Sequence, residues 1–410
     1  MTWNEDRITL LLREVGDEPP RGPRVDLLGA LREGRRRRRR HRTAVVGGAA
    51  LATVLVVGAI PLILRPAPPV VPPAASPPTA CDVASLPLPE GADGGAVSGG
   101  DRTGRWLIGS AARRGSPQQT AVLWHDDRVT ELPGALRHGV AAAVNSAGTV
   151  VGTADDRAYV VRDGRVERLP GGDGLRPTAV DDAGRVVGER QQPVGRRTRP
   201  VPVLWASPTS EPGDLALPGV GWEGTAIGIA EDGTVIGVVS AGGLDLVDGY
   251  GPNLNRGYRW RPDGTGEFLP MPATAGDGAG GFWPRSVGGT WVLGHTPREQ
   301  PRELYAPALL DLRTDAFVAP PAIAGFGPVS VNSRGWTVGT YGRMEAGQIG
   351  GALLTDAGLL RLPDPVPGAG LRHPVPGVVS DDGRVIAGEQ LADTDADPSA
   401  VGRPIRWLCR

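Results

Sequence analysis

Short apolar runs separated by turn residues recur along most of this chain, most clearly in residues 141–170. That segment, AAAVNSAGTVVGTADDRAYVVRDGRVERLP, holds four runs that are apolar or alternate in polarity, and they stop at Gly, Asp or Asn. This pattern is typical of β-strands joined by tight turns. The segment therefore predicts four short strands: AAAV, TVVG, AYVV and RVERLP.

The same order of signals returns about every 40–50 residues up to the C-terminus, a period that indicates a solenoid or a propeller. The first strand of each repeat ends in a four-residue turn, in most cases of the form Asp/Asn-x-x-Gly. Asp and Asn can bond their own backbone, and Gly accepts a positive φ. The seven predicted turns are Asp101–Gly104, Asn145–Gly148, Asp181–Gly184, Ala230–Gly233, Ser286–Gly289, Asn332–Gly335 and Ser380–Gly383.

Tryptophan and the dipeptide Leu-Pro also occupy repeated positions. We expect the tryptophans to pack between neighbouring repeats, because large aromatic side chains bury much apolar area. The fourth strand of most repeats ends in Leu-Pro, which suits an outer edge because proline cannot donate to a sheet ladder. The repeated tryptophans are Trp106, Trp124, Trp205, Trp260, Trp291, Trp336 and Trp407.

The two ends of the repeat region complete one another. The last repeat stops after its third strand, RPIRWLCR, and residues 81–89, CDVASLPLP, form a fourth strand without a repeat of its own. Together they make a seventh four-stranded blade, so residues 81–410 are predicted to be an all-β, seven-bladed β-propeller closed by its N-terminal strand. Alignment with the turn at Asp163-Gly164 places Cys409 and Cys81 side by side, which predicts a disulfide bond in an oxidising compartment.

An uncharged stretch of 21 residues, Ala44–Leu64, lies ahead of the propeller. Its length matches the roughly 20 residues that a helix needs to cross the hydrocarbon of a bilayer. The arginine block Arg35–Arg40 directly precedes it, which predicts a cytoplasmic N-terminus and an extracytoplasmic C-terminal domain. A cleaved signal peptide is the alternative, but the leading region and the apolar stretch are both long for one.

Two further segments flank the predicted span. Residues 1–43 form a basic cytoplasmic tail with 12 Arg and 7 acidic residues, and two short amphipathic patterns lie in residues 1–34. The tail is interpreted either as a frayed juxtamembrane segment or as a docking element for a cytoplasmic protein. Residues 65–80 are rich in proline and predict an extended spacer between membrane and propeller.

Composition and motifs give little support for catalysis. The chain has 410 residues and a net charge of −1, and all 44 of its basic residues are Arg, so overall charge gives no reason to expect a nucleic-acid partner. It has no nucleophile elbow, no phosphate-binding loop and no Cys/His spacing of a metal site. The paired aspartates at 126–127, 181–182 and 381–382 fall in predicted turns, which explains them without a metal. We expect no catalytic residue, cofactor or metal ion.

Arginine and tryptophan recur just before the predicted innermost strands. Connections at that place share one face of a propeller around its channel, and loops on a rigid scaffold are common binding sites. Arginine with exposed tryptophan suits an anionic or carbohydrate ligand. The alternative is that Arg137 and Arg372 repeat only because each pairs with a local acid. The candidates are Arg137, His138, Arg176, Arg372, His373, Trp222 and Trp283.

The pattern (A/V)-V-N/D-x-x-G-x-V-V-G, followed by x-V-L-W-x-D-G-x-V-x-x-L-P, resembles the HAF-type extracellular repeat proteins. The resemblance covers residues 81–410 and is clearest in 120–133 and 141–170. It implies a surface or exported β-propeller with no assigned catalytic residues. The His-Ala-Phe lead into the third strand is absent, since residues 119–121 read QTA and 157–159 read RAY. The tail, arginine block and span resemble actinobacterial-type single-pass anchors, including some anti-sigma-like proteins.

These patterns favour a single-pass membrane protein that displays a propeller outside the cell and binds a protein or glycan there. Two alternatives from other classes stay open. One is a transmembrane regulator whose cytoplasmic tail, residues 1–34, binds a signalling partner. The other is an extracytoplasmic glycan-acting hydrolase or lyase, which requires carboxylates clustered on one face of the propeller.

Overall fold

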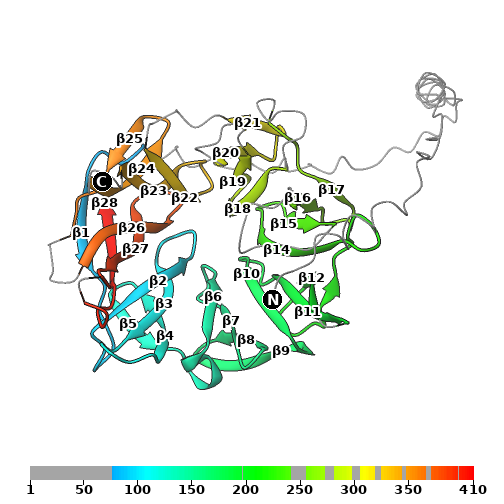
Figure 1. The fold of residues 1–410 in the computed structure, drawn as a ribbon, viewed down its shortest axis with the longest axis horizontal. Helices are drawn as coiled ribbons and strands as arrows, with labels where there is room; N and C mark the ends of the chain where they lie inside the picture. The colour runs from blue at the N-terminus through cyan, green and yellow to red at the C-terminus, as the bar shows by residue number, and fades with distance from the viewer. Residues whose placement is uncertain are drawn as a thin grey trace, which may run out of the picture. The chain divides into compact units, whose positions relative to one another are not determined.

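The computed structural model describes residues 76–195, 197–241, 255–272, 281–297, 305–318, 325–343, 348–365, 371–395 and 397–410. They form seven antiparallel, four-stranded sheets around a common axis (Figure 1). The predicted seven-bladed propeller is confirmed. The predicted tail 1–43, span 44–64 and first part of the spacer lie outside the described residues. In the ranges given above, no helix has the length and apolar character needed to cross a bilayer.

The strands of each blade follow one another outward from the axis. Blade 1 contains β2 (Gly94–Gly100), β3 (Trp106–Ala112), β4 (Gln119–His125) and β5 (Arg128–Glu131). The short 3-10 helix η1 (Gly134–His138) leads to blade 2, with β6 (Val140–Val144), β7 (Val150–Ala154), β8 (Arg157–Arg162) and β9 (Arg165–Asp173). Blade 3 contains β10 (Leu175–Val180), β11 (Val186–Val194), β12 (Arg197–Trp205) and β13 (Gly213–Asp214).

The remaining blades repeat this order until the last one. Blade 4 contains β14 (Glu223–Ile229), β15 (Val235–Ser240), β16 (Asn255–Trp260) and β17 (Gly266–Phe268). Blade 5 contains β18 (Trp283–Gly288), β19 (Trp291–Pro297), β20 (Tyr305–Asp311) and β21 (Ala316–Val318). Blade 6 contains β22 (Phe326–Val331), β23 (Thr337–Arg343), β24 (Gln348–Thr355) and β25 (Gly358–Arg361). Blade 7 contains β26 (Leu371–Val379), β27 (Val385–Ala392), β28 (Arg403–Cys409) and, as its outer strand, β1 (Cys81–Ser85).

The N-terminal strand closes the ring as predicted. Strand β1 pairs with β28 from Cys81 opposite Cys409 to Ser85 opposite Ile405. A disulfide bond joins the two cysteines across 328 residues of chain. The pairing continues beyond the bond, because the Thr79 amide donates to the Arg410 carbonyl at 2.8 Å. Both the predicted disulfide and the predicted order of strands in the last blade are confirmed.

The turn between the inner and second strand of each blade, here called the inner turn, has the predicted chemistry in six blades. In blade 2 the Gly148 amide donates to the Asn145 carbonyl at 2.9 Å, and Gly148 has φ +77°. Blade 5 differs from the prediction, because β18 continues through Ser286 and the turn lies at Gly289 and Thr290, between Gly288 and Trp291. Two adjacent glycines permit this shorter turn, with Gly289 at φ +59°.

Four tryptophans each anchor one blade to the preceding blade. Trp124, Trp205, Trp260 and Trp407 are at most 1% exposed. Each indole nitrogen donates to a backbone carbonyl of the preceding outer strand or the residues that follow it. The acceptors are Pro87 at 2.7 Å, Pro170 at 3.0 Å, Ala216 at 2.6 Å and Pro363 at 2.8 Å, in the same order. The Leu-Pro ends of three outer strands thus supply an acceptor that satisfies a fully buried indole.

The other repeated tryptophans face the inner turn of the next blade. A Cβ added to Gly148 lies 2.7 Å from the ring of Trp106, and one added to Gly383 lies 2.7 Å from the ring of Trp336. Trp291 stands in the same relation to Gly335. Because glycine has no Cβ, it permits both the positive φ of each of these turns and the close approach of an indole ring. The expected packing of the repeated tryptophans between blades is confirmed.

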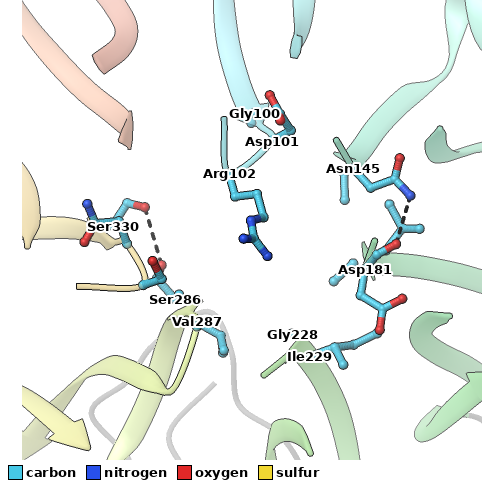
Figure 2. Close-up of a pocket in the computed structure, with 18 of the residues that line it drawn as sticks. Gly100, Asp101, Arg102, Asn145, Asp181, Gly228, Ile229, Ser286, Val287 and Ser330 are labelled. Atoms are coloured by element: carbon cyan, nitrogen blue, oxygen red, sulfur yellow. Dashed lines mark hydrogen bonds between the residues drawn. The ribbon is translucent and has the colours of Figure 1, made fainter. Parts of the chain in front are cut away.

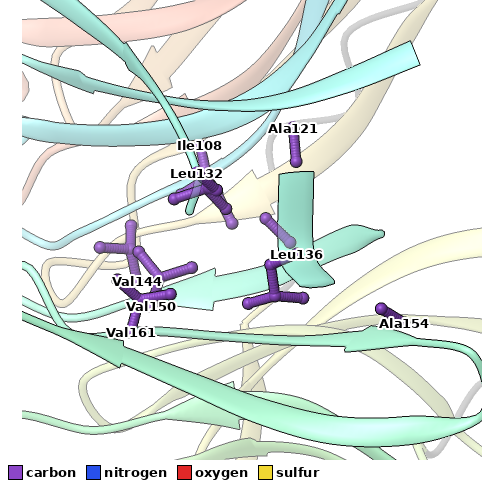
Figure 3. Close-up of a cluster of buried hydrophobic side chains, with 9 residues drawn as sticks. Ile108, Ala121, Leu132, Leu136, Val144, Val150, Ala154 and Val161 are labelled. Carbon is purple, nitrogen blue, oxygen red and sulfur yellow. The ribbon is translucent and has the colours of Figure 1, made fainter. Parts of the chain in front are cut away.

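The hydrophobic core of the described residues consists of seven clusters, one at each junction between neighbouring blades. Figure 3 shows the junction of blades 1 and 2, where Ile108, Leu132 and Leu136 pack against Val144 and Val150. Equivalent clusters fill the other six junctions, including the junction of blade 7 with blade 1. Each blade is buried on both faces by its neighbours. Closure at β1 therefore completes a core that no single blade can form.

Candidate functional site

The residues predicted to bind a ligand lie at or just before the starts of the inner strands. Arg137 ends η1 and contacts Glu131 at 2.6 Å, and Arg176 of β10 contacts Asp156 of blade 2 at 3.1 Å. Arg372 of β26 contacts Asp393 at 2.8 Å and also Asp395. Each of these guanidinium groups therefore has an acidic partner. Their role in ligand binding stays a prediction.

The aromatic and histidine candidates lie at the same ends of the inner strands. Trp222 is half-buried, and its ring centroid lies 5.5 Å from that of Phe268. Trp283 is half-buried opposite His295 in the ladder of β18 and β19. His138 is exposed on η1. Burial lowers the pKa of His373 below its ordinary range, and the adjacent Arg372 lowers it further.

A cavity of about 500 Å³, here called the axial cavity, lies at the opposite ends of the inner strands. It is lined by the last residues of the inner strands and by the inner turns, and all seven inner turns are described. None of the seven predicted binding residues lines it. The inner strand of every blade has a β-bulge before this cavity, for example at Ser98 in blade 1 and Arg285 in blade 5. Bulges redirect side chains and are common beside functional sites.

The first residue of several inner turns holds the wall of the cavity together. Asn145 accepts hydrogen bonds from the amides of Ala147 and Thr149, and its side-chain nitrogen donates to the Asp181 carbonyl of blade 3 at 2.9 Å. Asn332 repeats this arrangement toward Ser380 of blade 7, also at 2.9 Å. These contacts tie neighbouring turns to one another, so the wall is rigid where a ligand would touch it.

Some charged residues of the wall serve the turns themselves. Asp101 is buried and accepts hydrogen bonds from the amides of Thr103 and Trp106 at 2.9 and 2.8 Å. Asp181 forms an ion pair with Arg185 at 2.6 Å within one inner turn. Asp101 is thus satisfied by its own turn, and Asp181 and Arg185 neutralise each other.

The second residues of five inner turns line the cavity. Arg102 extends into it in Figure 2 and lies 3.2 Å from Asp381 of blade 7 and 3.6 Å from Asp182 of blade 3. Asp182 also accepts a hydrogen bond from the Ser146 amide at 2.9 Å, and Asp381 accepts one from the Ser333 amide at 3.0 Å. One guanidinium thus connects carboxylates from two other blades.

Glu231 and Arg285 are exposed residues of the same wall that have opposite charges and no ion-pair partner among the described residues. Glu231 is the second residue of the blade 4 turn, and its backbone amide donates to the Gly289 carbonyl of blade 5 at 2.9 Å. Arg285 occupies the bulge of β18 in blade 5. Over the described ranges, neither side chain forms an ion pair, although both line the axial cavity.

The described residues also bear on metal binding. They contain no group of three or more His, Cys, Asp or Glu side chains that could hold a metal ion. Asp126 and Asp127 form the turn between β4 and β5, with Asp126 at φ +52° and paired with Arg105 at 3.2 Å. This aspartate pair therefore lies in a tight turn, as the sequence predicted.

The sequence reasoning missed Arg102, Glu231 and Arg285. A usable signal exists for two of them, because aligning the predicted turns places Arg102, Asp182, Glu231, Ser333 and Asp381 at one repeated position. The residue at that position lines the cavity in each of these five blades. Arg285 had no such signal, because the bulge appears only in the pairing of the strands.

No protein-family model matches the chain, and no curated protein matches its sequence. Solved structures match it through the propeller. The β-propeller domain of the Trilobed protease from Pyrococcus furiosus is 12% identical, with a TM-score of 0.50 over 77% of this chain and 94% of that one. An oligogalacturonate lyase from Vibrio parahaemolyticus is 10% identical, with a TM-score of 0.53 over 80% of this chain and 97% of that one. An acylaminoacyl peptidase from Pyrococcus horikoshii is 11% identical, with a TM-score of 0.50 over 72% of this chain and 49% of that one, so this chain spans about half its length.

At these identities the likeness shows the fold alone. The three proteins are a protease, a lyase and a peptidase, so the shared fold selects no activity for this chain. The Pyrococcus furiosus domain is described as having an open velcro topology, whereas β1 and a disulfide close the last blade here. The resemblance to HAF-type repeat proteins is confirmed only as far as the propeller fold.

Proposed function

We propose that this protein is a membrane-anchored, extracytoplasmic binding module rather than an enzyme. The observation that carries the proposal is the axial cavity, which lies in a ring closed by a disulfide bond. Its volume falls in the range of about 300–1,000 Å³ that small-molecule sites occupy. The cavity wall combines rigid backbone turns with charged side chains from several blades, a combination that favours recognition.

The location outside the cytoplasm rests on the same bond. Disulfides persist in oxidising compartments and are rare in the cytosol. The apolar segment Ala44–Leu64 and the preceding arginines supply an anchor with the N-terminus inside. The tail 1–34 is then free to contact a cytoplasmic protein, and the propeller a protein or glycan outside.

The wall of the cavity supports binding better than glycan cleavage. Asp182 and Asp381 share Arg102 and also accept hydrogen bonds from backbone amides. Both oxygens of each carboxylate are therefore engaged, and neither is left to transfer a proton to a substrate. A pair of carboxylates with separated acid and base roles is the feature that a glycosidase requires.

The location is tested on intact cells that express the full chain. The cells are treated with a membrane-impermeant reductant and then with an impermeant maleimide that adds mass to each free thiol. We expect Cys81 and Cys409 to be tagged only after reduction, without permeabilisation. Tagging that requires permeabilised cells places the propeller in the cytoplasm, and tagging without reductant shows that the disulfide is absent. Either result contradicts the proposal. A cytoplasmic thiol protein of the same cells serves as the control for intactness.

A further inference from the structure

The charges of the axial cavity do not balance within the wall. Once Asp101, which accepts hydrogen bonds from backbone amides, and the ion pair of Asp181 with Arg185 are set aside, three carboxylates and two guanidinium groups are left. They are Asp182, Glu231 and Asp381, against Arg102 and Arg285. Arg102 is committed to two of the carboxylates. Glu231 and Arg285 are then the groups that are free for a ligand.

Glu231 and Arg285 belong to neighbouring blades, and the backbone hydrogen bond from Glu231 to Gly289 fixes those blades against each other on this side. The two side chains have opposite charges, line one cavity, and yet form no ion pair in the part of the chain that is described. A ligand that carries both charges and enters between these two side chains is attracted by each of them. Attraction of this kind strengthens as water leaves the cavity, because the effective dielectric constant falls.

We propose that the axial cavity binds a small zwitterion, a molecule that carries an ammonium and a carboxylate group. This rests on the proposed binding function and names its ligand class. Arg285 holds the carboxylate, for which a guanidinium fork is the best-matched side chain. Glu231 holds the ammonium, with the excess negative charge of Asp182 and Asp381 nearby in the same wall.

The same charges disfavour the simpler ligands. An anion without an ammonium group meets three carboxylates and gains only Arg285, because Arg102 is already engaged. A cation without a carboxylate leaves the Arg285 guanidinium without a partner and is repelled by it. An uncharged sugar uses neither group. A ligand with both charges is the class that satisfies both free side chains.

The test uses the full chain in lipid nanodiscs and measures binding by calorimetric titration. The probes are the free amino acids, their N-acetyl forms, which lack the ammonium, and their amides, which lack the carboxylate. We expect at least one free amino acid to bind, and both of its blocked forms to bind at least tenfold more weakly. Arg285→Gln and Glu231→Gln are each expected to weaken binding of the free amino acid at least tenfold. Arg285→Gln should leave the already weak binding of the amide unchanged.

Arg162→Gln is the matched control, because Arg162 pairs with Glu167 on the outer strands of blade 2 and is absent from the cavity wall. It should bind like the unaltered protein. If a free amino acid and its N-acetyl or amide form bind equally well, the proposed zwitterionic ligand is refuted, but the proposed binding function is not. If no free amino acid binds, the proposed zwitterionic ligand is also refuted. The thiol-tagging experiment judges the proposed location independently of both results.

Discussion

The disulfide between Cys81 and Cys409 gives the largest stability effect that can be worked out from the structure. The bond closes a loop across 328 residues. In the chain-entropy model, a loop of that length lowers the entropy of the unfolded chain by about 19 cal/mol/K, which corresponds to about 6 kcal/mol at 25 °C. Native disulfides usually contribute less than this limit. We therefore expect the double variant Cys81→Ala, Cys409→Ala to lose about 2–5 kcal/mol of unfolding free energy.

The folded ring should survive the change. Strand β1 keeps its five residue pairs with β28, and the Trp124 indole keeps its hydrogen bond to the Pro87 carbonyl at 2.7 Å. The loss therefore arises mainly in the unfolded state, which becomes less compact without the cross-link. Because a less compact unfolded state exposes more surface, the dependence of the unfolding free energy on urea should become steeper.

The assay is urea unfolding of the full chain in detergent, followed by tryptophan fluorescence, with and without reductant. Reduction should shift the midpoint of the unaltered protein to that of the double alanine variant. Reductant should not move the midpoint of the variant itself. A midpoint that is the same for the oxidised protein and for the variant would show that β1 is held without help from the bond, and the entropic argument would be refuted.

Three further predictions concern the junctions between blades. Trp205→Phe removes the indole donor from the Pro170 carbonyl and leaves that acceptor buried, so it should cost about 1–3 kcal/mol in urea unfolding; no change would mean that water replaces the indole. Gly148→Ala forces a side chain onto φ +77° and against Trp106, and should cost about 1–2 kcal/mol or more; a loss below that would show that the turn relaxes. Burial raises the pKa of the Glu389 carboxyl, so the folded state holds its proton at higher pH than the unfolded state, and stability falls as pH rises through that window. Glu389→Gln should therefore raise the melting temperature at pH 7 and not at pH 4, and an equal change at both pH values would contradict a protonation effect.

Most of the scaffold was predictable because the same strand and turn signals recur in each repeat. The turn signals at Asn145–Gly148 and the Leu-Pro ends of the outer strands follow from local backbone chemistry, which acts the same way in every blade. The last repeat, which ends at RPIRWLCR, lacks a fourth strand, and the extra strand at the start of the repeat region supplies it. This pairing also identified the partner of Cys409. Blade 5 was the exception, because Gly288 and Gly289 allow a shorter turn that the repeat pattern does not encode.

The candidate site was much harder to predict from the sequence. Recurrence of Leu-Arg in the connections led to Arg137 and Arg372, whose guanidinium groups have acidic partners within reach, Glu131 and Asp393. These partners lie in the same blade or the adjoining connection, as the alternative interpretation expected, whereas the contacts of Arg102 reach Asp182 and Asp381 in other blades, which no pattern within one repeat contains. The bulge that brings Arg285 to the cavity is likewise a property of how β18 and β19 pair.

The constraints on the inner turn indicate which of its residues can determine the ligand that the cavity binds. Its first residue and its glycine are constrained, since Asn145 bonds the backbone and Gly148 must accept both a positive φ and the ring of Trp106. The side chain of the second residue is not tied to its own turn in this way, and five blades place that residue on the wall of the axial cavity. A propeller built this way keeps its scaffold in the repeated positions and leaves specificity to residues such as Glu231.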